Sequence, residues 1–269
     1  MNYLHSSCLG LSLCLATGTL HAAEEHSADE LAKQLANPVA SLISVPLQYN
    51  YDENIGPDDK GTRHTTNLQP VAPFSIGEDW NLISRTILPL IDQTDIAPGT
   101  GNQTGTGDVV QSLFFSPKEP SESGWIWGVG PVFLLPTASD DLLGSDQWGM
   151  GPTAVALKQV GPWTVGALVN HIEHVTTDGG HDDVSATFLQ PFINYGLPGG
   201  VTLALNTEAT YDWEHDEAAV PINLMMNKVT KIGSQMIQFG GGARYWAESS
   251  DSGPEGWGAR VNFVLLFPK

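Results

Sequence analysis

Twelve segments with strand-like patterning follow one another along this chain of 269 residues, and most have ten to thirteen residues. Strands of soluble sheets usually have about five or six residues, whereas a tilted strand needs about nine to eleven to cross a bilayer. Clusters of Gly, Pro and Asp separate the segments, as turns between strands require. The pattern predicts an all-β chain whose strands can span a membrane. The segments are residues 40–51, 65–76, 80–91, 107–116, 125–136, 148–160, 163–174, 183–196, 201–212, 219–230, 234–247 and 256–267.

Long and short connections alternate between these segments. The long ones have six to fifteen residues and are rich in Asp and Gly, whereas most of the others are shorter; residues 117–124 are the exception. An up-and-down barrel with both termini in the periplasm has long loops outside and short turns inside. A Greek-key sandwich, the soluble alternative, predicts no such alternation. We therefore predict an up-and-down transmembrane β-barrel of about 12 antiparallel strands, in the outer membrane and in contact with its lipid.

The last segment, Gly256–Phe267, has the period of two that is typical of a strand. Its two ends carry Trp257 and Phe267, about 33 Å apart at about 3.3 Å per residue, which suits an aromatic at each membrane interface. It resembles the C-terminal signal that the barrel-assembly machinery recognises, although Pro268 and Lys269 follow the last aromatic. Its apolar face consists of Val261, Phe263, Leu265 and Phe267, and its polar face of Arg260 and Asn262.

Tryptophan residues are concentrated at or near the ends of the predicted strands. In outer-membrane barrels, aromatic side chains form girdles at both interfaces. Tryptophan in a soluble fold lies more often in the middle of the core, so this distribution also favours the barrel. The residues are Trp80, Trp125, Trp148, Trp163, Trp246 and Trp257.

The N-terminal residues 1–23 have the pattern of a signal peptide. An apolar core at residues 8–20 precedes small residues suited to cleavage, although no Lys or Arg precedes the core. Both cysteines of the chain lie in this segment, so the exported protein would fold without a disulfide. Residues 24–38 predict a helical lead-in in the periplasm, or a small plug, with Ser27 and Glu30 placed as a capping box. The barrel would then comprise residues 39–269.

The chain is strongly acidic, with 30 Asp and Glu against 11 Lys and Arg and a net charge of −19. Such a chain repels phosphates, which argues against a nucleic-acid partner. Paired carboxylates in the long loops could attract cations or hold Ca²⁺, but none has the spacing of a calcium loop. Solvated loops are the simpler interpretation. The pairs are Asp58-Asp59, Asp140-Asp141, Asp182-Asp183 and Asp216-Glu217.

Alternation predicts which polar side chains would face the inside of the barrel. Arg or Lys on the lipid face costs about 2–4 kcal/mol near the membrane midplane, so polar residues opposite an apolar face should point inward. The predicted lining could form a polar pore for a small solute, or its charges could neutralise one another and block a narrow lumen. The predicted pore-lining residues are Arg85, Asn206, Glu208, Gln238, Arg244, Arg260 and Asn262.

A histidine-rich stretch offers a second candidate site. His171 and His174 lie near His181 and two aspartates, a combination that can bind a transition metal. Residues three apart on a strand point to opposite faces, so a shared metal requires the strand to have ended. Some twelve-stranded barrels are lipid hydrolases with Ser and His on the outer wall, but no Ser follows His171 closely. We therefore predict no metal, no cofactor and no catalytic residue.

Several stretches together resemble one family of bacterial envelope proteins. They are NPVASLISVP at 37–46, NIGP at 54–57, WNLISRT at 80–86, TFLQPF at 187–192, TYDW at 210–213 and GARYWAE at 242–248. This family is named for the MetA pathway of phenol degradation, and its members are often described as transporters. The resemblance implies an outer-membrane barrel that passes a small solute, hydrophobic or aromatic molecules included. The alternatives are a non-conducting barrel whose acidic loops bind a partner or metal, and a lipid-modifying enzyme.

Overall fold

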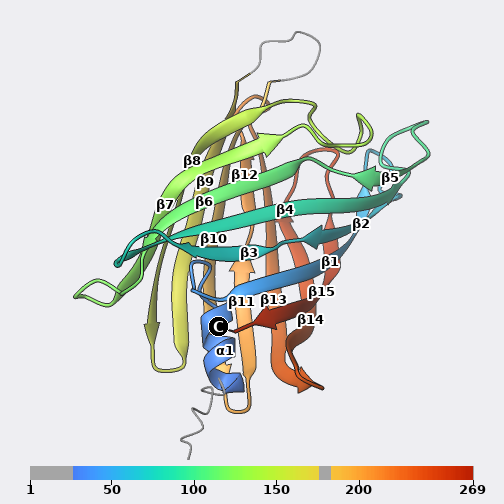
Figure 1. Cartoon of the computed structure of the whole chain (residues 1–269). Helices are drawn as coiled ribbons and strands as arrows, with labels where there is room; N and C mark the ends of the chain where they lie inside the picture. The colour runs from blue at the N-terminus through green and yellow to red at the C-terminus, as the bar shows by residue number, and fades with distance from the viewer. Residues whose placement is uncertain (1–26, 176–182, 269) are drawn as a thin grey trace, which may run out of the picture.

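The computed structural model describes residues 27–175 and 183–268 (Figure 1). Within these residues the chain forms one helix and fifteen strand segments. The predicted signal peptide and residues 24–26 lie outside the described residues. The elements are α1 (Ala28–Leu35), β1 (Ile43–Ile55), β2 (Gly61–Leu68), β3 (Val71–Ser75), β4 (Trp80–Thr94), β5 (Asn102–Thr106), β6 (Val109–Pro117), β7 (Trp125–Leu135), β8 (Gly149–Val160), β9 (Trp163–His174), β10 (Ser185–Leu197), β11 (Val201–Thr207), β12 (Ala209–Asp212), β13 (Glu217–Ile232), β14 (Gln235–Glu248) and β15 (Gly256–Phe267).

The segments form a closed antiparallel barrel of 12 strands, which confirms the predicted fold class. Each strand pairs with its neighbours along the chain, and β1 closes the barrel against β15 from Ile43 opposite Phe267 to Tyr51 opposite Ala259. Three strands of the barrel are interrupted, so that β2 and β3, β5 and β6, and β11 and β12 each follow one another along a single strand. The alternative interpretation, a soluble Greek-key sandwich, is therefore wrong.

The interruptions explain where the predicted strand limits differ from the structure. The predicted strand at residues 65–76 breaks at Gln69 and Pro70, because Pro70 cannot donate a ladder hydrogen bond. The predicted strand at residues 201–212 breaks at Glu208, between β11 and β12. The structure also extends β1 to Ile55, beyond the predicted limit at Tyr51. This extension turns Asp52 from a loop residue into a strand residue.

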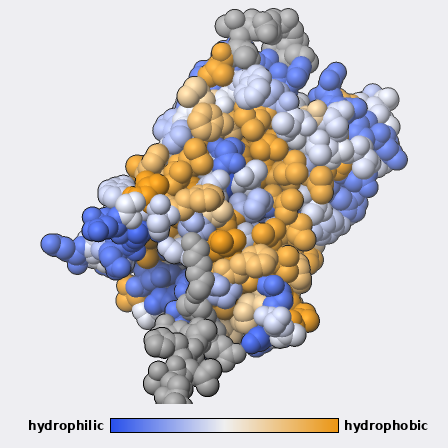
Figure 2. All heavy atoms as spheres, viewed as in Figure 1, coloured by the Kyte–Doolittle hydropathy of each residue, from blue (hydrophilic) through white to orange (hydrophobic). Residues whose placement is uncertain are grey.

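The barrel wall is apolar outside and polar inside, the reverse of a soluble protein. On β13, Leu224 and Met226 point outward and are 59% and 60% exposed, whereas the intervening Asn223 and Asn227 point inward and are buried. On β15, Val261 and Phe263 face outward and Arg260 is buried inside, as predicted. Hydrophobic residues cover much of the wall seen in Figure 2, and hydrophilic residues gather at its loops. This exterior suits a hydrocarbon environment.

Five of the six tryptophans noted in the sequence lie exposed at the ends of strands. Trp80, Trp125 and Trp163 begin β4, β7 and β9 at the short-turn end, and Trp148 and Trp257 lie at the long-loop end. Trp246 contradicts the predicted girdle position, because its indole Nε1 donates inward to Asp52 at 2.8 Å. Trp246 lies two residues after Arg244 on β14, so both side chains point into the barrel. Its position near the end of the strand therefore did not predict which face of the wall it occupies.

The helix α1 lies in the short-turn end of the barrel, beside the C-terminal residues (Figure 1). The Ser27 hydroxyl caps it by accepting from the Glu30 backbone N–H at 3.1 Å. Leu31 and Ala32 are buried against inward-facing residues of β13 and β15 and against the chain that leads into β1; these residues are Leu42, Val229, Val264 and Leu266. We call residues 28–42 the plug segment. No helix within the described ranges is long and apolar enough to cross a membrane.

Candidate functional site

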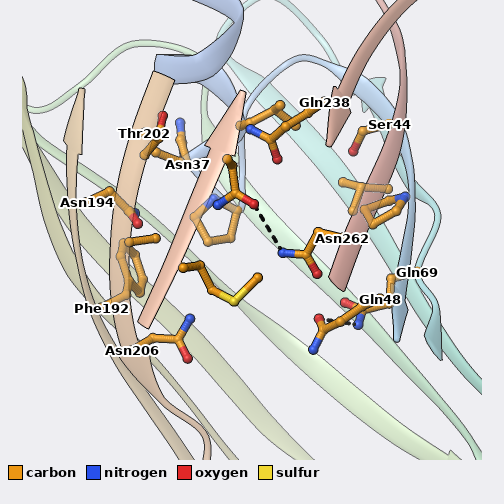
Figure 3. Close-up of a pocket in the computed structure, with 18 of the residues that line it drawn as sticks. Asn37, Ser44, Gln48, Gln69, Phe192, Asn194, Thr202, Asn206, Gln238 and Asn262 are labelled. Atoms are coloured by element: carbon orange, nitrogen blue, oxygen red, sulfur yellow. Dashed lines mark hydrogen bonds between the residues drawn. The ribbon is translucent and has the colours of Figure 1, made fainter. Parts of the chain in front are cut away.

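A cavity of about 250 Å³ lies inside the barrel beside the plug segment (Figure 3). Its lining is rich in side-chain amides, which converge on it from strands on opposite sides of the barrel. In Figure 3, Asn262 donates toward Asn227 at 3.5 Å, and Gln69 donates to Gln48 at 3.0 Å. The other residues labelled there are Asn37, Ser44, Phe192, Asn194, Thr202, Asn206 and Gln238. Amides can both donate and accept, so this surface can hold water or a polar solute.

The seven residues predicted to line a pore all face the lumen. Arg244 is not part of the cavity lining, but it forms an ion pair with Glu208, which is. The other six line the cavity itself: Arg85, Asn206, Glu208, Gln238, Arg260 and Asn262. The structure thus brings together residues from β4, β11, β14 and β15, together with Glu208 from the break between β11 and β12.

Glu208 is the central carboxylate of this group. It interrupts the ladder between β11 and β12, where its backbone N–H donates to Pro221 at 3.3 Å. Its two carboxylate oxygens each accept a 2.7 Å hydrogen bond from Arg260, one from Nη1 and one from Nη2. The Arg260 Nε donates to Asn50 at 2.7 Å. This bidentate geometry is the strong form of an arginine–carboxylate pair, and it fixes both side chains in the lumen.

Arg244 extends the charge group toward the long-loop end of the barrel. Its Nε lies 2.9 Å from the Asp52 carboxylate, and its Nη1 lies 3.4 Å from Glu208. Its guanidinium also stacks on Trp246, 4.6 Å from the ring centroid. The sequence did not reveal Asp52, Asn50 or Trp246 as members of this group. The alternation of β1 was the available signal for Asn50, since it shares a face with Ser44 and Gln48.

An apolar cluster fills the opposite side of the lumen. Val39 of the plug segment meets inward-facing side chains of four strands, all nearly inaccessible to solvent, and Phe188 and Phe192 of β10 pack beside them. The cluster consists of Val39, Ile83, Phe114, Val155, Leu157 and Leu168. The sequence pattern did not reveal this half-filled interior. Its signal is the nearly continuous apolar character of β7 and of β8 around Val155 and Leu157.

The connection between β7 and β8 is bonded to an inward-facing residue at the long-loop end of the barrel, which we call the mouth. The Leu142 carbonyl accepts a 3.0 Å hydrogen bond from Gln93, a buried and inward-facing residue of β4. The Asp108 carboxylate accepts from the backbone N–H groups of Ala138 at 3.1 Å and Ser145 at 2.6 Å. These bonds hold residues 137–147 at the mouth. The predicted outer loop is therefore packed against the barrel interior.

The histidine-rich stretch lies at the long-loop end of β9. His171 points outward, with Nδ1 3.0 Å from the Thr187 hydroxyl and Nε2 3.3 Å from Glu173. His174 lies 3.6 Å from Asp183, and His181 lies outside the described residues. Within residues 27–175 and 183–268, no group of three or more His, Cys, Asp or Glu is arranged to hold a metal ion. The predicted absence of a metal or cofactor stays a prediction.

Comparisons with known proteins identify the architecture. No family model and no curated protein matches the chain. Among solved structures, the COG4313 outer membrane channel from Pseudomonas putida F1 aligns with a TM-score of 0.66 and 16% identity, over 84% of this chain and 96% of that one. The β domain of the Bordetella autotransporter BrkA gives a TM-score of 0.48 at 12% identity, over 84% of this chain and 99% of that one. The Salmonella typhi outer membrane phospholipase dimer gives a TM-score of 0.49 at 12% identity, over 88% of this chain and 98% of that one. The chain therefore has the fold of an outer-membrane β-barrel, in the form seen in the Pseudomonas putida channel.

Proposed function

We propose that this protein is an outer-membrane channel that passes a small solute along the polar side of its lumen. The observation that carries the proposal is the cavity of about 250 Å³ inside a closed barrel, lined with amides and arginines. A barrel that served only as a membrane anchor would need no such unfilled polar space. The apolar exterior supports a place in the outer membrane, and the structural likeness is to a protein described as a channel.

The solute class expected from the family resemblance, hydrophobic or aromatic molecules included, agrees with the mixed character of the interior. The polar wall is formed by β1, β11, β13, β14 and β15 together with Arg85 of β4, and the apolar wall by Ile83 of β4 and residues of β6, β8 and β9. A solute would travel between Glu208 and the plug segment. Both the plug segment and residues 137–147 narrow this path, so we infer a small conductance that depends on their displacement.

The second candidate function is a non-conducting barrel whose acidic loops bind a partner or metal. The apolar cluster around Phe114 favours it, because these side chains close half of the lumen. A lipid-modifying enzyme has less support. In the part of the chain that the structure describes, two outward-facing histidines lie beside a hydroxyl, His171 beside Thr187 at 3.0 Å and His64 beside Tyr49 at 2.7 Å, and neither hydroxyl belongs to a serine.

Single-channel recording separates the first two functions. The purified full-length protein in a planar bilayer should give discrete current steps. Insertion is verified in parallel by the mobility difference between unheated and boiled samples on an SDS gel, which a folded barrel should show. Protein that inserts in this folded form and never conducts would contradict the channel and leave the loop-binding barrel.

The closing strand gives a prediction about assembly, and its recognition by the barrel-assembly machinery stays a proposal. Phe267 is 41% exposed on the outer wall and pairs with Ile43 where β15 meets β1. Phe267→Ala removes an aromatic worth about 2 kcal/mol of apolar contact with lipid, so the assembled fraction in the outer membrane should fall. Removal of Pro268 and Lys269 should leave assembly unchanged. If both variants assemble as well as the native protein, measured by heat-modifiable mobility, Gly256–Phe267 is not the recognised signal.

A further inference from the structure

The fixed charge inside the barrel is opposite in sign to that of the whole chain. The chain carries −19, yet the charged side chains that meet inside the barrel around Glu208 and on the nearby strands β1, β2 and β4 are four arginines and two carboxylates. They are Arg63, Arg85, Arg244 and Arg260, with Asp52 and Glu208. The interior therefore has an excess of positive charge that the composition conceals.

The two carboxylates are already matched by two of the arginines. Asp52 pairs with Arg244 at 2.9 Å, and Glu208 pairs with Arg260 at 2.7 Å. Because both pairs are largely buried, with side-chain exposures of 3% to 20%, they are geometrically fixed. Asp52 also lies opposite Arg63 in the β1–β2 register, but its close contact is to Arg244, so the other two arginines have no carboxylate in contact.

Arg63 and Arg85 are held by neutral amides. The Arg63 Nε donates to Gln93 at 2.8 Å, and the Arg85 Nη2 donates to Gln69 at 3.2 Å. Among the described residues, neither guanidinium has a carboxylate within 4 Å. An amide orients a guanidinium without neutralising it, and each guanidinium has five N–H donors, so both can still bind a planar anion.

The surroundings of Arg85 also indicate the chemistry of the anion. The cavity that Arg85 lines is bounded in addition by apolar side chains, namely Leu42, Val71, Phe192 and Met225. A carboxylate with a short apolar body would place its charge at the guanidinium and its hydrocarbon against these residues. An ammonium with the same body would meet an unpaired positive charge there.

We propose that the channel selects small organic carboxylates over cations, and that Arg63 and Arg85 are its specificity-determining residues. This inference rests on the proposed channel function. Pores that pass anions use Arg and Lys side chains in their lining. The acidic residues of the long loops do not reverse this preference. They lie in solvent, where charges are screened beyond about 10 Å at 0.1 M salt, whereas lumen charges are screened much less.

Reversal potentials in a KCl gradient test the proposal with the full-length protein. The native protein should prefer chloride, and the double variant Arg63→Gln/Arg85→Gln should lower the chloride-to-potassium permeability ratio by about threefold or more. The matched control is Lys158→Gln, which removes one positive charge from the outer face of β8 and should leave the ratio unchanged. A cation-selective native channel, or a double variant with the native ratio, would overturn the proposal.

Equilibrium binding tests the inference separately from conduction. Hexanoate and hexylammonium share one apolar body and differ in charge, and calorimetric titration of the folded, detergent-solubilised protein compares them directly. Hexanoate should bind more tightly, and the double variant should lose this preference. If the protein inserts without conducting, the channel function fails, and this titration then decides the inference by itself. Equal or tighter binding of hexylammonium to the native protein would overturn it.

Discussion

Replacing Leu31 by Asp is expected to raise the single-channel conductance severalfold. Leu31 is fully buried, and it packs against Val229, Val264 and Leu266 on the inner wall of the barrel. An unpaired carboxylate in this apolar contact costs several kcal/mol, unless α1 leaves the lumen and the charge reaches water. The strand ladder that closes the barrel does not include α1, so the barrel should remain folded while its short-turn end opens.

The polar contacts of α1 are too weak to hold it in place after this substitution. The Asp29 carboxylate accepts from the Gly200 N–H, and Gln159 donates to the Lys33 carbonyl at 2.9 Å. Each such bond contributes about 1–3 kcal/mol at most.

The control for Leu31→Asp is Lys33→Ala, which changes an exposed side chain of the same helix and should keep the native conductance. Planar-bilayer recording of the three proteins makes the comparison. A native conductance in Leu31→Asp, in a barrel that still shows heat-modifiable mobility, would mean that α1 does not obstruct the path.

Glu208→Gln is expected to lower the temperature at which the barrel loses its folded mobility on SDS gels. The carboxylate accepts two 2.7 Å bonds from Arg260 and lies 3.4 Å from Arg244. Glutamine has nearly the same shape but no charge, so the buried Arg260 would lose its counter-ion. Removing one partner of such a pair costs about 3–5 kcal/mol, because the remaining charge stays desolvated. The variant also adds one unit of positive charge to the lumen, so its preference for chloride should increase.

The double variant Glu208→Gln/Arg260→Gln provides the control. It removes both charges of the pair, and it should recover part of the lost stability because no uncompensated charge is left at this position. Arg244 would keep its contact with Asp52 at 2.9 Å. Native stability in the single variant would contradict the central role of Glu208, and a double variant less stable than the single one would contradict the charge-pair explanation.

Local patterning was sufficient to predict the barrel and the orientation of many side chains. The period of two in β13 and β15 separates Leu224 and Phe263, which face outward, from Asn223 and Arg260, which face inward. A one-residue shift would exchange the two faces, so the pattern by itself specifies which residues enter the lumen. The same reasoning placed Arg85 and Glu208 inside the barrel, without revealing what they contact.

Position near a strand end was a weaker guide than alternation. Trp246 was expected in an interface girdle, yet its place on β14 turns it toward Asp52. Asp52 was itself assigned to a loop, because the apolar alternation of β1 stops at Tyr51. The hydrogen bonds of β1 to β2 continue beyond that point, and they carry Asp52 into the wall of the barrel.

The sequence by itself determined the membrane-spanning barrel, its helix and the inward direction of its polar residues, because each of these depends on neighbours along the chain. Only the tertiary structure decided which of these residues meet. Asn50 and Arg260 are 210 positions apart, and their contact depends on closure of β1 against β15. Glu208 and Arg260 are 52 positions apart, and their contact depends on the curvature of the sheet from β12 through β13 and β14 to β15. The filling of the lumen by Val39 and Phe114, and the two arginines left without carboxylates, likewise follow from packing across the barrel, on which local periodicity carries no information.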